Sequence, residues 1–540
     1  MYKIYQNKQT LPIKNASIKV LLVIAGAVLF NIIFWQEKVA VNAVLFDVFV
    51  VWSVFYLYPS FFSNPLMKWL LAAHFITLLS LVIQNTFLSK LAFSATLLLV
   101  VVFSQYRHRS VWYAAASAVM NYLLMVPSFF TNLQWAGSSK VNFDSIKRSI
   151  RFLIIPIMLL MVFFILYNFA NAIFMHLVND AGIALTKFFN RFFSWFSWDR
   201  LGFLLLGIFI TGGLLLKSSV NWFSEADVKK GNDLWRKKKD FLKWKQSAWF
   251  DLLSLLMGKF ASGIMALRNE HRTAVISLFL LNVLLLCINC VDITYVWFGF
   301  TYHNDLNLSE YVHEGTGLLI FSILLAMVLL LFFFRGNLNF YRKNKWLRLG
   351  AYAWLLQNGV LVVSVFFRDY YYIQHQGLAY KRIGVLIFLL MVVTGLATVF
   401  IKIHQRKTTY YLLRVNAWFA IIVLVLASCI HWDETIASYN LARKDTIPLD
   451  IKFLLSLSDK VLPVLQKNID VLDKPAIAIQ GEGEYLYRST LTPQQLFENR
   501  KKEFSEAQKS YSWLSWNMAD AQVKRELGEI EQLHTSSIHK

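Results

Sequence analysis

Long apolar segments alternate with short charged segments along most of the chain. A helix needs about 20 mainly apolar residues to cross the hydrocarbon core of a bilayer. The apolar runs are continuous and lack the alternation of barrel strands, so the pattern predicts membrane-spanning helices. Eleven segments meet this description: 20–35, 38–58, 66–84, 90–105, 152–175, 201–217, 273–297, 315–334, 349–367, 384–401 and 413–431.

A further apolar segment, 111–130, is less regular. It contains Asn121 and Pro127 and follows the polar run 107–109 directly. The chain is basic both before the first span and at 140–151, and basic loops stay on the cytoplasmic side of a membrane. An even number of spans must then precede residue 130. We therefore interpret 111–130 as an interfacial or re-entrant segment and not as a twelfth span.

The orientation of the spans follows from the distribution of Lys and Arg between the loops. Residues 217–272 hold the densest basic run and are predicted to be cytoplasmic, whereas 298–314 are acidic and predicted to lie outside. Basic loops at 335–348 and 402–414 return to the cytoplasmic side. The N-terminus is then cytoplasmic, and the residues after 431 lie outside. The expected location is a cell membrane.

The pattern predicts an all-α protein: a polytopic bundle of transmembrane helices with a small C-terminal helical domain outside the membrane. Within the tail, Thr492-Pro493 is expected to begin a helix, because proline is tolerated in the first helical turn. Five regions are predicted: a cytoplasmic N-terminus at 1–19, an N-terminal membrane region at 20–217, a basic cytoplasmic loop with an amphipathic helix at 218–272, a C-terminal membrane region at 273–431, and an extracytoplasmic helical tail at 432–540.

The composition supports a membrane protein, because 57% of the residues are hydrophobic and only 16% are charged, against about 25% charged in soluble domains. The tail from residue 431 onward holds 14 basic and 16 acidic residues, so the net charge of +22 comes from the rest of the chain. This excess can attract anionic lipid to the basic loop. No nucleic-acid recognition motif accompanies it, so no nucleic acid partner is expected.

Several short motifs combine in the second half of the chain. Arg368, Tyr372-Ile373, Gly377-Leu378-Ala379 and Arg382 lie around one predicted turn between spans, Ser309–Gly315 precede an earlier span, and Tyr439-Asn440 and Ser515-Trp516-Asn517 lie in the tail. Together they resemble an uncharacterised family of bacterial multi-pass membrane proteins catalogued as a domain of unknown function (the 4173 and 4153 types). The resemblance covers about 270–520. It implies a location in the cytoplasmic membrane of a bacterium, and it implies no activity. Ala379 stands where the family pattern has threonine, which argues against a hydroxyl-dependent role there.

Polar groups inside predicted spans form a first set of candidate functional residues, because an ionisable group in a bilayer is costly. Asp47 lies in the middle of the second span and could bind a proton or a cation. The alternative is a carboxyl group that only bonds to a neighbouring helix. Asp292 and Asn282 belong to the same candidate intramembrane polar site, and Asn282 and Asn289 are also suited to hydrogen bonds between helices.

Charged residues at the predicted outer ends of two spans form a second candidate cluster. Glu310, His313 and Glu314 share one helix face by their spacing. We expect them to meet Arg368, Asp369 and Arg382 in a charged cluster, in which carboxylates pair with guanidinium groups. The alternative is ordinary anchoring at the membrane surface. A metal site at His313 is a remote option, and no metal or other cofactor is expected.

Two functions compete. The first is a non-catalytic envelope scaffold or sensor whose outer tail binds a protein partner, motivated by the polar tail and the basic loop. The second is a permease for a small solute, motivated by Asp47, Asp292 and a glycine pair, Gly212-Gly213, expected to interrupt its helix. The sequence contains no phosphate-binding glycine loop, nucleophile elbow or metalloprotease motif. We therefore expect a protein that is not an enzyme and name no catalytic residue.

Overall fold

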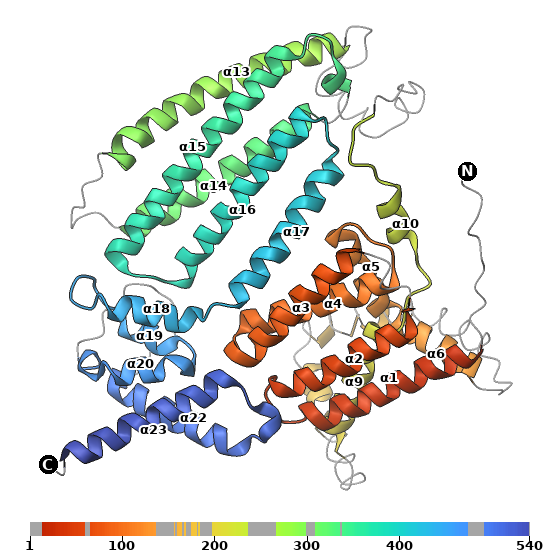
Figure 1. Ribbon diagram of the computed structural model, residues 1–540, viewed down its shortest axis with the longest axis vertical. Helices are drawn as coiled ribbons and strands as arrows, with labels where there is room; N and C mark the ends of the chain where they lie inside the picture. Colours follow the sequence, from red (N-terminus) through yellow and green to blue (C-terminus); the bar gives the residue numbers. More distant parts are fainter. Residues whose placement is uncertain are drawn as a thin grey trace. The chain divides into compact units, whose positions relative to one another are not determined.

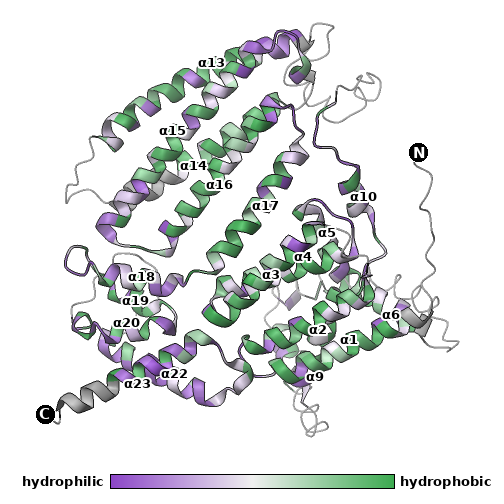
Figure 2. Ribbon diagram, in the orientation of Figure 1, coloured by the Kyte–Doolittle hydropathy of each residue, from purple (hydrophilic) through white to green (hydrophobic). Residues whose placement is uncertain are grey.

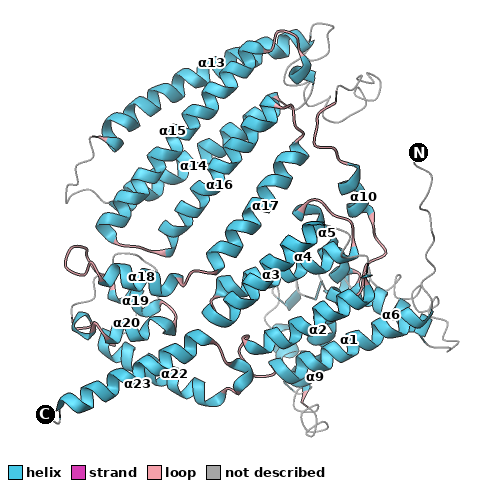
Figure 3. Ribbon diagram, viewed as in Figure 1, coloured by secondary structure: helices cyan, strands magenta, loops and turns pink. Residues whose placement is uncertain are grey.

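The computed structural model describes residues 13–59, 65–136, 197–235, 266–298, 308–334, 337–473 and 491–538, together with short pieces of 156–183. The regular elements in these ranges are helices (Figure 3), and the only pairing of strand type is an isolated bridge between Asp233 and Lys407. The all-helical fold class predicted from the sequence is thus confirmed for the described chain.

Eight helices in the described ranges are long and apolar enough to cross a membrane. Their apolar residues dominate the colouring of Figure 2. Two shorter apolar helices are α2 (Val41–Leu57) and the apolar part of α14 (Leu308–Phe333). The predicted span 152–175 and most of the predicted basic loop 218–272 with its amphipathic helix lie largely outside the described residues. The eight are α1 (Ile13–Phe34), α3 (Pro65–Gln84), α4 (Phe87–Gln105), α9 (Trp198–Leu215), α13 (Ala266–Asp292, continued by a π-helical turn to Trp297), α15 (Lys345–Gln376), α16 (Tyr380–His404) and α17 (Thr409–Ser428).

The segment 111–130 forms two short helices, α5 (Val111–Leu123) and α6 (Met125–Ala136), which meet at an angle of 59°. Such a bent pair is either a broken span or a re-entrant loop. The irregularity expected from Asn121 and Pro127 is therefore present, with the break at Leu124.

The described chain divides into two compact units. In the first unit, α1 packs against α6 and α9. Gly207 allows α9 to approach α1 closely, because a Cβ there would lie 3.0 Å from the backbone oxygen of Ala27. Gly212 and Gly213 do not interrupt α9, which continues to Leu215, so this expectation was wrong. The missing side chains instead leave room for Met125 and Tyr122 beside the break between α5 and α6.

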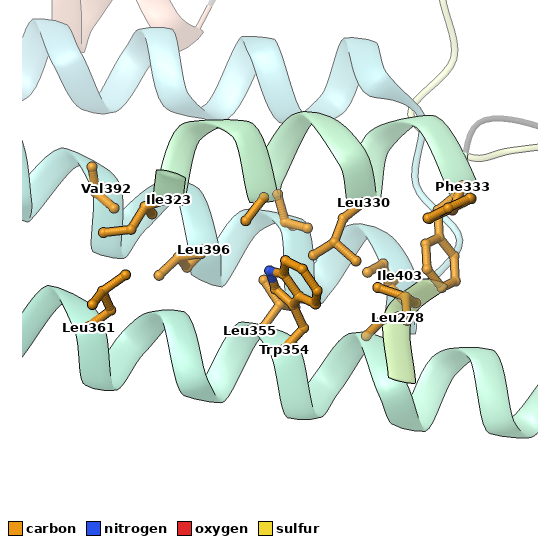
Figure 4. Packing of buried hydrophobic residues seen from close by; sticks show 14 of the residues in the cluster. Leu278, Ile323, Leu330, Phe333, Trp354, Leu355, Leu361, Val392, Leu396 and Ile403 are labelled. Carbon is orange, nitrogen blue, oxygen red and sulfur yellow. The ribbon is translucent and has the colours of Figure 1, made fainter. Parts of the chain in front are cut away.

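In the second unit, α13, α15, α16 and α17 lie side by side in that order, with α14 packed on α15 and α16 (Figure 1). Their shared core contains Leu278 from α13, Leu330 from α14, Trp354 from α15 and Leu396 from α16 (Figure 4). The helices α3 and α4 pack together and against α17, which completes the bundle.

The helices of the second unit have two distinct ends. At the tail end, the amide of Gln84, the last residue of α3, donates to the backbone oxygen of Cys429 at the end of α17 (3.3 Å). At the basic-loop end, Arg348 near the start of α15 donates to the backbone oxygen of His404 at the end of α16 (2.9 Å). The backbone N–H of Leu234 donates to Arg406 there (2.9 Å), so segments of three basic loops meet at this end.

The tail, which follows α17, packs at the end of the second unit where α3 and α17 end. Its helices are α18 (Trp432–Leu441), α19 (Ile451–Ser456), α20 (Leu462–Gln466), α22 (Pro493–Ser510) and α23 (Met518–Ile538). Thr492, the residue before Pro493, forms a capping box with Gln495, which confirms the predicted helix start. The apolar core of the tail includes Ala379, which precedes α16, and Ile383 of α16. The tail and the membrane helices therefore share one core.

Candidate functional site

The turn between α15 and α16 lies at the centre of the candidate site. Gly377 ends α15 with a φ of +79°, a conformation that favours glycine, and its N–H donates to the backbone oxygen of Ile373 (3.0 Å). A Cβ on Gly377 would lie 2.5 Å from Oδ1 of Asn440. The glycine is therefore required both by the turn and by the close approach of the tail.

Arg382 closes this turn from the inside. Its buried guanidinium donates to the backbone oxygens of Gln376 (3.0 Å) and Gly377, and lies 3.9 Å from the centre of the Tyr372 ring. Carbonyl groups at the end of a helix attract cations, and the aromatic face adds a cation–π contact. The arginine thus replaces the hydrogen-bond partners that the last residues of α15 lack.

Two polar side chains of α18 attach the tail to the turn. The Asn440 Oδ1 accepts from the backbone N–H of Leu378 (2.6 Å), and its Nδ2 donates to the backbone oxygen of the same residue (2.9 Å). The carboxylate of Asp433 accepts from the hydroxyl groups of Tyr380 and Ser458, each at 2.5 Å. We call the turn Gln376–Arg382 with Asp433 and Asn440 the hairpin–tail junction.

The structure describes three of the six residues of the predicted outer cluster. Arg382 belongs to the hairpin–tail junction, whereas Arg368 forms an ion pair with Asp292 of α13 (2.6 Å). Asp369 is 1% exposed, and its Oδ2 finds no hydrogen-bond partner among the described residues. The side chains of Glu310, His313 and Glu314 lie outside the described part of the structure. No group of three potential metal ligands occurs among the described residues.

The polar residues of the predicted intramembrane site lie in different places. Asn282 and Asp292 are on α13 and face α15, where Asn282 accepts from Gln357 (2.9 Å) and donates to the backbone oxygen of Gly350 (3.0 Å). Asn289 donates to the backbone oxygen of Gln357 (3.1 Å). These contacts, with the Asp292–Arg368 pair, form a polar seam between α13 and α15. Asp47 is a buried residue of α2 in the first unit.

The residues of the hairpin–tail junction lie within a region that matches a known protein family. The family described as Domain of unknown function (DUF4153) matches residues 48–468. The chain belongs to this family. Searches of the curated proteins and of the solved structures found no match. The DUF4153 match ends within the tail, so it includes the turn, Asp433 and Asn440.

Ala379 stands where the resemblance described above has threonine. Ala379 is the residue that precedes α16, with an extended backbone and no side-chain hydrogen bond to the helix. Threonine at this position can cap a helix through its hydroxyl group. The missing hydroxyl therefore removes a helix cap, while the surrounding junction keeps its other contacts.

One buried polar network was missed by the sequence analysis. Asp227 in α10 (Trp222–Lys229) accepts from His108 Nδ1 (3.1 Å), from the Tyr410 hydroxyl (2.5 Å), and from the backbone N–H groups of Arg109 (2.7 Å) and Ser110 (3.1 Å). Burial alone would raise the pKa of the Asp227 carboxyl, but these hydrogen bonds lower it below its ordinary value. The network joins the basic-loop segment to α17 at the basic-loop end.

The carboxylate, imidazole and hydroxyl groups of this network are connected in the same sequence as in a Ser-His-Asp hydrolase triad, because His108 Nε2 lies 2.9 Å from the Ser117 hydroxyl. However, Ser117, His108 and Asp227 are all buried, and Asp227 is occupied by four donors. A substrate has no access to such a serine. The arrangement therefore acts as a structural connection, and the run 107–109 beside 111–130 was its only signal in the sequence.

Proposed function

We propose that this DUF4153 protein is a non-catalytic envelope scaffold or sensor that acts through the tail after its last span. The observation that carries the proposal is the hairpin–tail junction, in which Asn440 holds both backbone groups of Leu378. A ligand or partner that displaces α18 must break these contacts. The turn between two spans then responds to an event in the tail.

The shared core supports the same role. Ala379, just before α16, and Ile383 of α16 belong to one core with Ile436 and Ala437 of α18, and all four are buried. Moving apolar surface from such a core into water costs a free energy of about 25 cal/mol per Å². Movement of the tail is therefore energetically coupled to the start of α16.

The proposal includes a topology and partners. About eleven spans would place the N-terminus in the cytoplasm of a bacterium and the tail outside its cytoplasmic membrane, where an envelope protein is the expected partner of the tail. The basic loop would face anionic lipid on the cytoplasmic side. In this arrangement, the basic-loop end of the second unit is cytoplasmic.

The test is complementation of a deletion strain with a chain that ends after residue 442. This truncation keeps Asp433 and Asn440, and so keeps the attachment of α18 to the turn. We expect the truncated chain to reach the membrane and to fail to complement. Membrane fractionation controls for insertion. Full complementation by a truncated chain at the wild-type level would refute a role of the tail.

A permease is the second candidate, favoured by the Asp292–Arg368 pair in the polar seam and by the buried Asp47. Charged groups inside spans often mark ion or solute pathways. This candidate predicts solute flux in proteoliposomes that Asp292→Asn or Asp47→Asn abolishes, with Asp233→Asn at the loop as the control. If the wild-type protein moves no solute from a panel of small ions and metabolites, the candidate loses its support.

A further inference from the structure

A polar cavity of about 160 Å³ lies at the tail end of the second unit. It is enclosed by the end of α3 and by α18, α20 and α23, and Ile83, Gln84, His431, Glu434, Lys460 and Glu526 are among its lining residues. A single water needs only about 10–15 Å³ of such space. The cavity is therefore large enough for a small organic group.

One side of the cavity presents hydrogen-bond donors. Lys460 Nζ uses two of its N–H bonds on the backbone oxygens of Gln84 and Asn85, both at 2.6 Å. Burial lowers the pKa of Lys460 to about 8, so the group is mostly charged at pH 7. The third N–H remains for a ligand.

His431 supplies a second donor. Its Nδ1 accepts from the backbone N–H of Glu434 (3.4 Å), so in the neutral ring the proton lies on Nε2. Burial and the charge of Lys460 lower the pKa of His431, which keeps the ring neutral at pH 7. Its buried Nε2 has no hydrogen-bond partner among the described residues.

Two carboxyl groups also line the cavity, those of Glu434 and Glu526. The Glu434 Oε2 lies 3.7 Å from His431 Nδ1. Burial and the neighbouring charge of Glu526 raise the pKa of Glu434, whereas Lys467 lowers it. Glu526 is held by Lys467 (2.8 Å) and Gln522 (2.9 Å). The lining thus combines hydrogen-bond donors with carboxyl groups, which suits a zwitterion.

The cavity lies at the level where the spans end. Ile83, in the last turn of α3, and Met518, at the start of α23, are both on its rim and exposed. The adjoining turn carries the exposed Trp513 and Trp516. Tryptophan at the end of a span is typical of the headgroup layer of a bilayer.

The same turn contacts Lys38. The backbone N–H of Lys38 donates to the Ser515 hydroxyl (2.8 Å), and Lys38 Nζ lies 4.8 Å from the centre of the Tyr511 ring. The cavity itself adjoins the link between α3 and α4, because Lys460 donates to the backbone oxygens of Gln84 and Asn85. Since α3 and α4 are both long enough to cross a membrane, their link is expected at the membrane surface, where phospholipid headgroups lie.

We propose that this cavity binds the phosphoethanolamine headgroup of a membrane phospholipid. The phosphate lies between Lys460 and His431, and the ammonium group faces Glu434 and Glu526. The acyl chains leave past Ile83 and Met518. This site goes beyond the scaffold or sensor role and does not depend on it.

The experiment is native mass spectrometry of the full-length protein, purified in detergent and mixed with equal amounts of phosphatidylethanolamine, phosphatidylglycerol and phosphatidylcholine. We expect the wild-type protein to retain phosphatidylethanolamine preferentially. Glu434→Gln should reduce this preference about ten-fold, because a charge-assisted contact to the ammonium is lost. Glu529→Gln is the matched control, because Glu529 is an exposed residue of α23 that does not line the cavity.

Lys460→Met should abolish retention of all three lipids, and Glu434→Gln decides the matter if that variant does not fold. Equal retention of the three lipids by the wild type, or an unchanged preference in Glu434→Gln, would overturn the site. Free phosphoethanolamine is added in a competing arm. If it displaces the lipid at equal concentration, the ligand is a soluble molecule, and the lipid assignment is wrong.

Discussion

At the residue scale, single polar groups decide how distant segments are joined. Asp227 satisfies two backbone N–H groups at the start of α5 and two side chains from other elements. Asn440 does the same for Leu378, with one amide group and two hydrogen bonds. Because each residue replaces water for several buried donors or acceptors, its loss leaves more than one polar group without a partner.

Asp227→Asn should lower the free energy of unfolding by about 3 kcal/mol, because the amide offers one acceptor oxygen where the carboxylate offered two. The pKa of Asp227 is lower in the folded protein than in the unfolded chain. Its contribution is therefore present above about pH 4 and lost as the pH falls below the folded pKa. Thermal unfolding in detergent from pH 7 down to about pH 2 measures this contribution, because the stability difference between the wild type and Asp227→Asn should shrink only below about pH 4.

The control is Asp233→Asn, whose side chain is 58% exposed and pairs with Lys407. Exposed ion pairs contribute about 0–1 kcal/mol, so this variant should unfold close to the wild type. Equal stability of both variants would contradict the role of Asp227.

Ala379→Ser should raise the free energy of unfolding by about 1 kcal/mol, because a serine hydroxyl caps the first turn of α16. Thermal unfolding in detergent measures the change. Ala379→Val adds bulk at this buried position without a hydroxyl and should be destabilising. A serine variant no more stable than the wild type would contradict the assignment of residue 379 as the missing cap.

At the element scale, close helix contacts depend on where side chains are absent. In α9, Gly213 lies under the Tyr122 ring and Gly212 lies against Met125. The two adjacent glycines therefore leave space for the residues on either side of the break between α5 and α6. Glycine usually weakens a helix by about 1 kcal/mol relative to alanine. Here the loss is offset by packing, and α9 continues through the pair.

Gly213→Ala should lower the free energy of unfolding by about 1–3 kcal/mol, because the new Cβ overlaps the Tyr122 ring. Gly202→Ala in the same helix is the control, since nothing lies within 4 Å of a Cβ there. That variant should be as stable as the wild type or more so. Thermal unfolding of the two purified variants compares them, and equal stability of the two would contradict the packing role of Gly213, because helix propensity alone would stabilise both.

At the scale of the whole molecule, the loops that meet at each end of the second unit agree with the distribution of charge along the chain. Lys402 near the end of α16 donates to the backbone oxygen of Phe334 after α14 (3.0 Å), and Arg348 reaches the end of α16. Segments with an excess of Lys and Arg therefore meet at one end of the second unit, and the nearly balanced tail packs at the other.

Reporter fusions at residues 135, 240, 305 and 435 test the resulting orientation. We expect fusions at 135 and 240 to report the cytoplasm and those at 305 and 435 to report the outside, because basic loops are retained in the cytoplasm. Alkaline phosphatase and a fluorescent protein, which are active on opposite sides, provide matched readouts. Fusions at 240 and 435 on the same side would refute the topology.

The sequence by itself determined the fold class, most helix positions and the helix start at Thr492, because apolar runs and caps are local signals. Only the tertiary structure decided that Asn440 binds Leu378, 62 residues earlier, and that Asp227 binds His108, 119 residues earlier. It also separated Arg368 from Arg382 and turned Gly212-Gly213 from an expected interruption into a packing surface. The physical reason is that a polar or missing side chain acquires its role from the group that packing places against it, and this leaves no periodic signal in the chain.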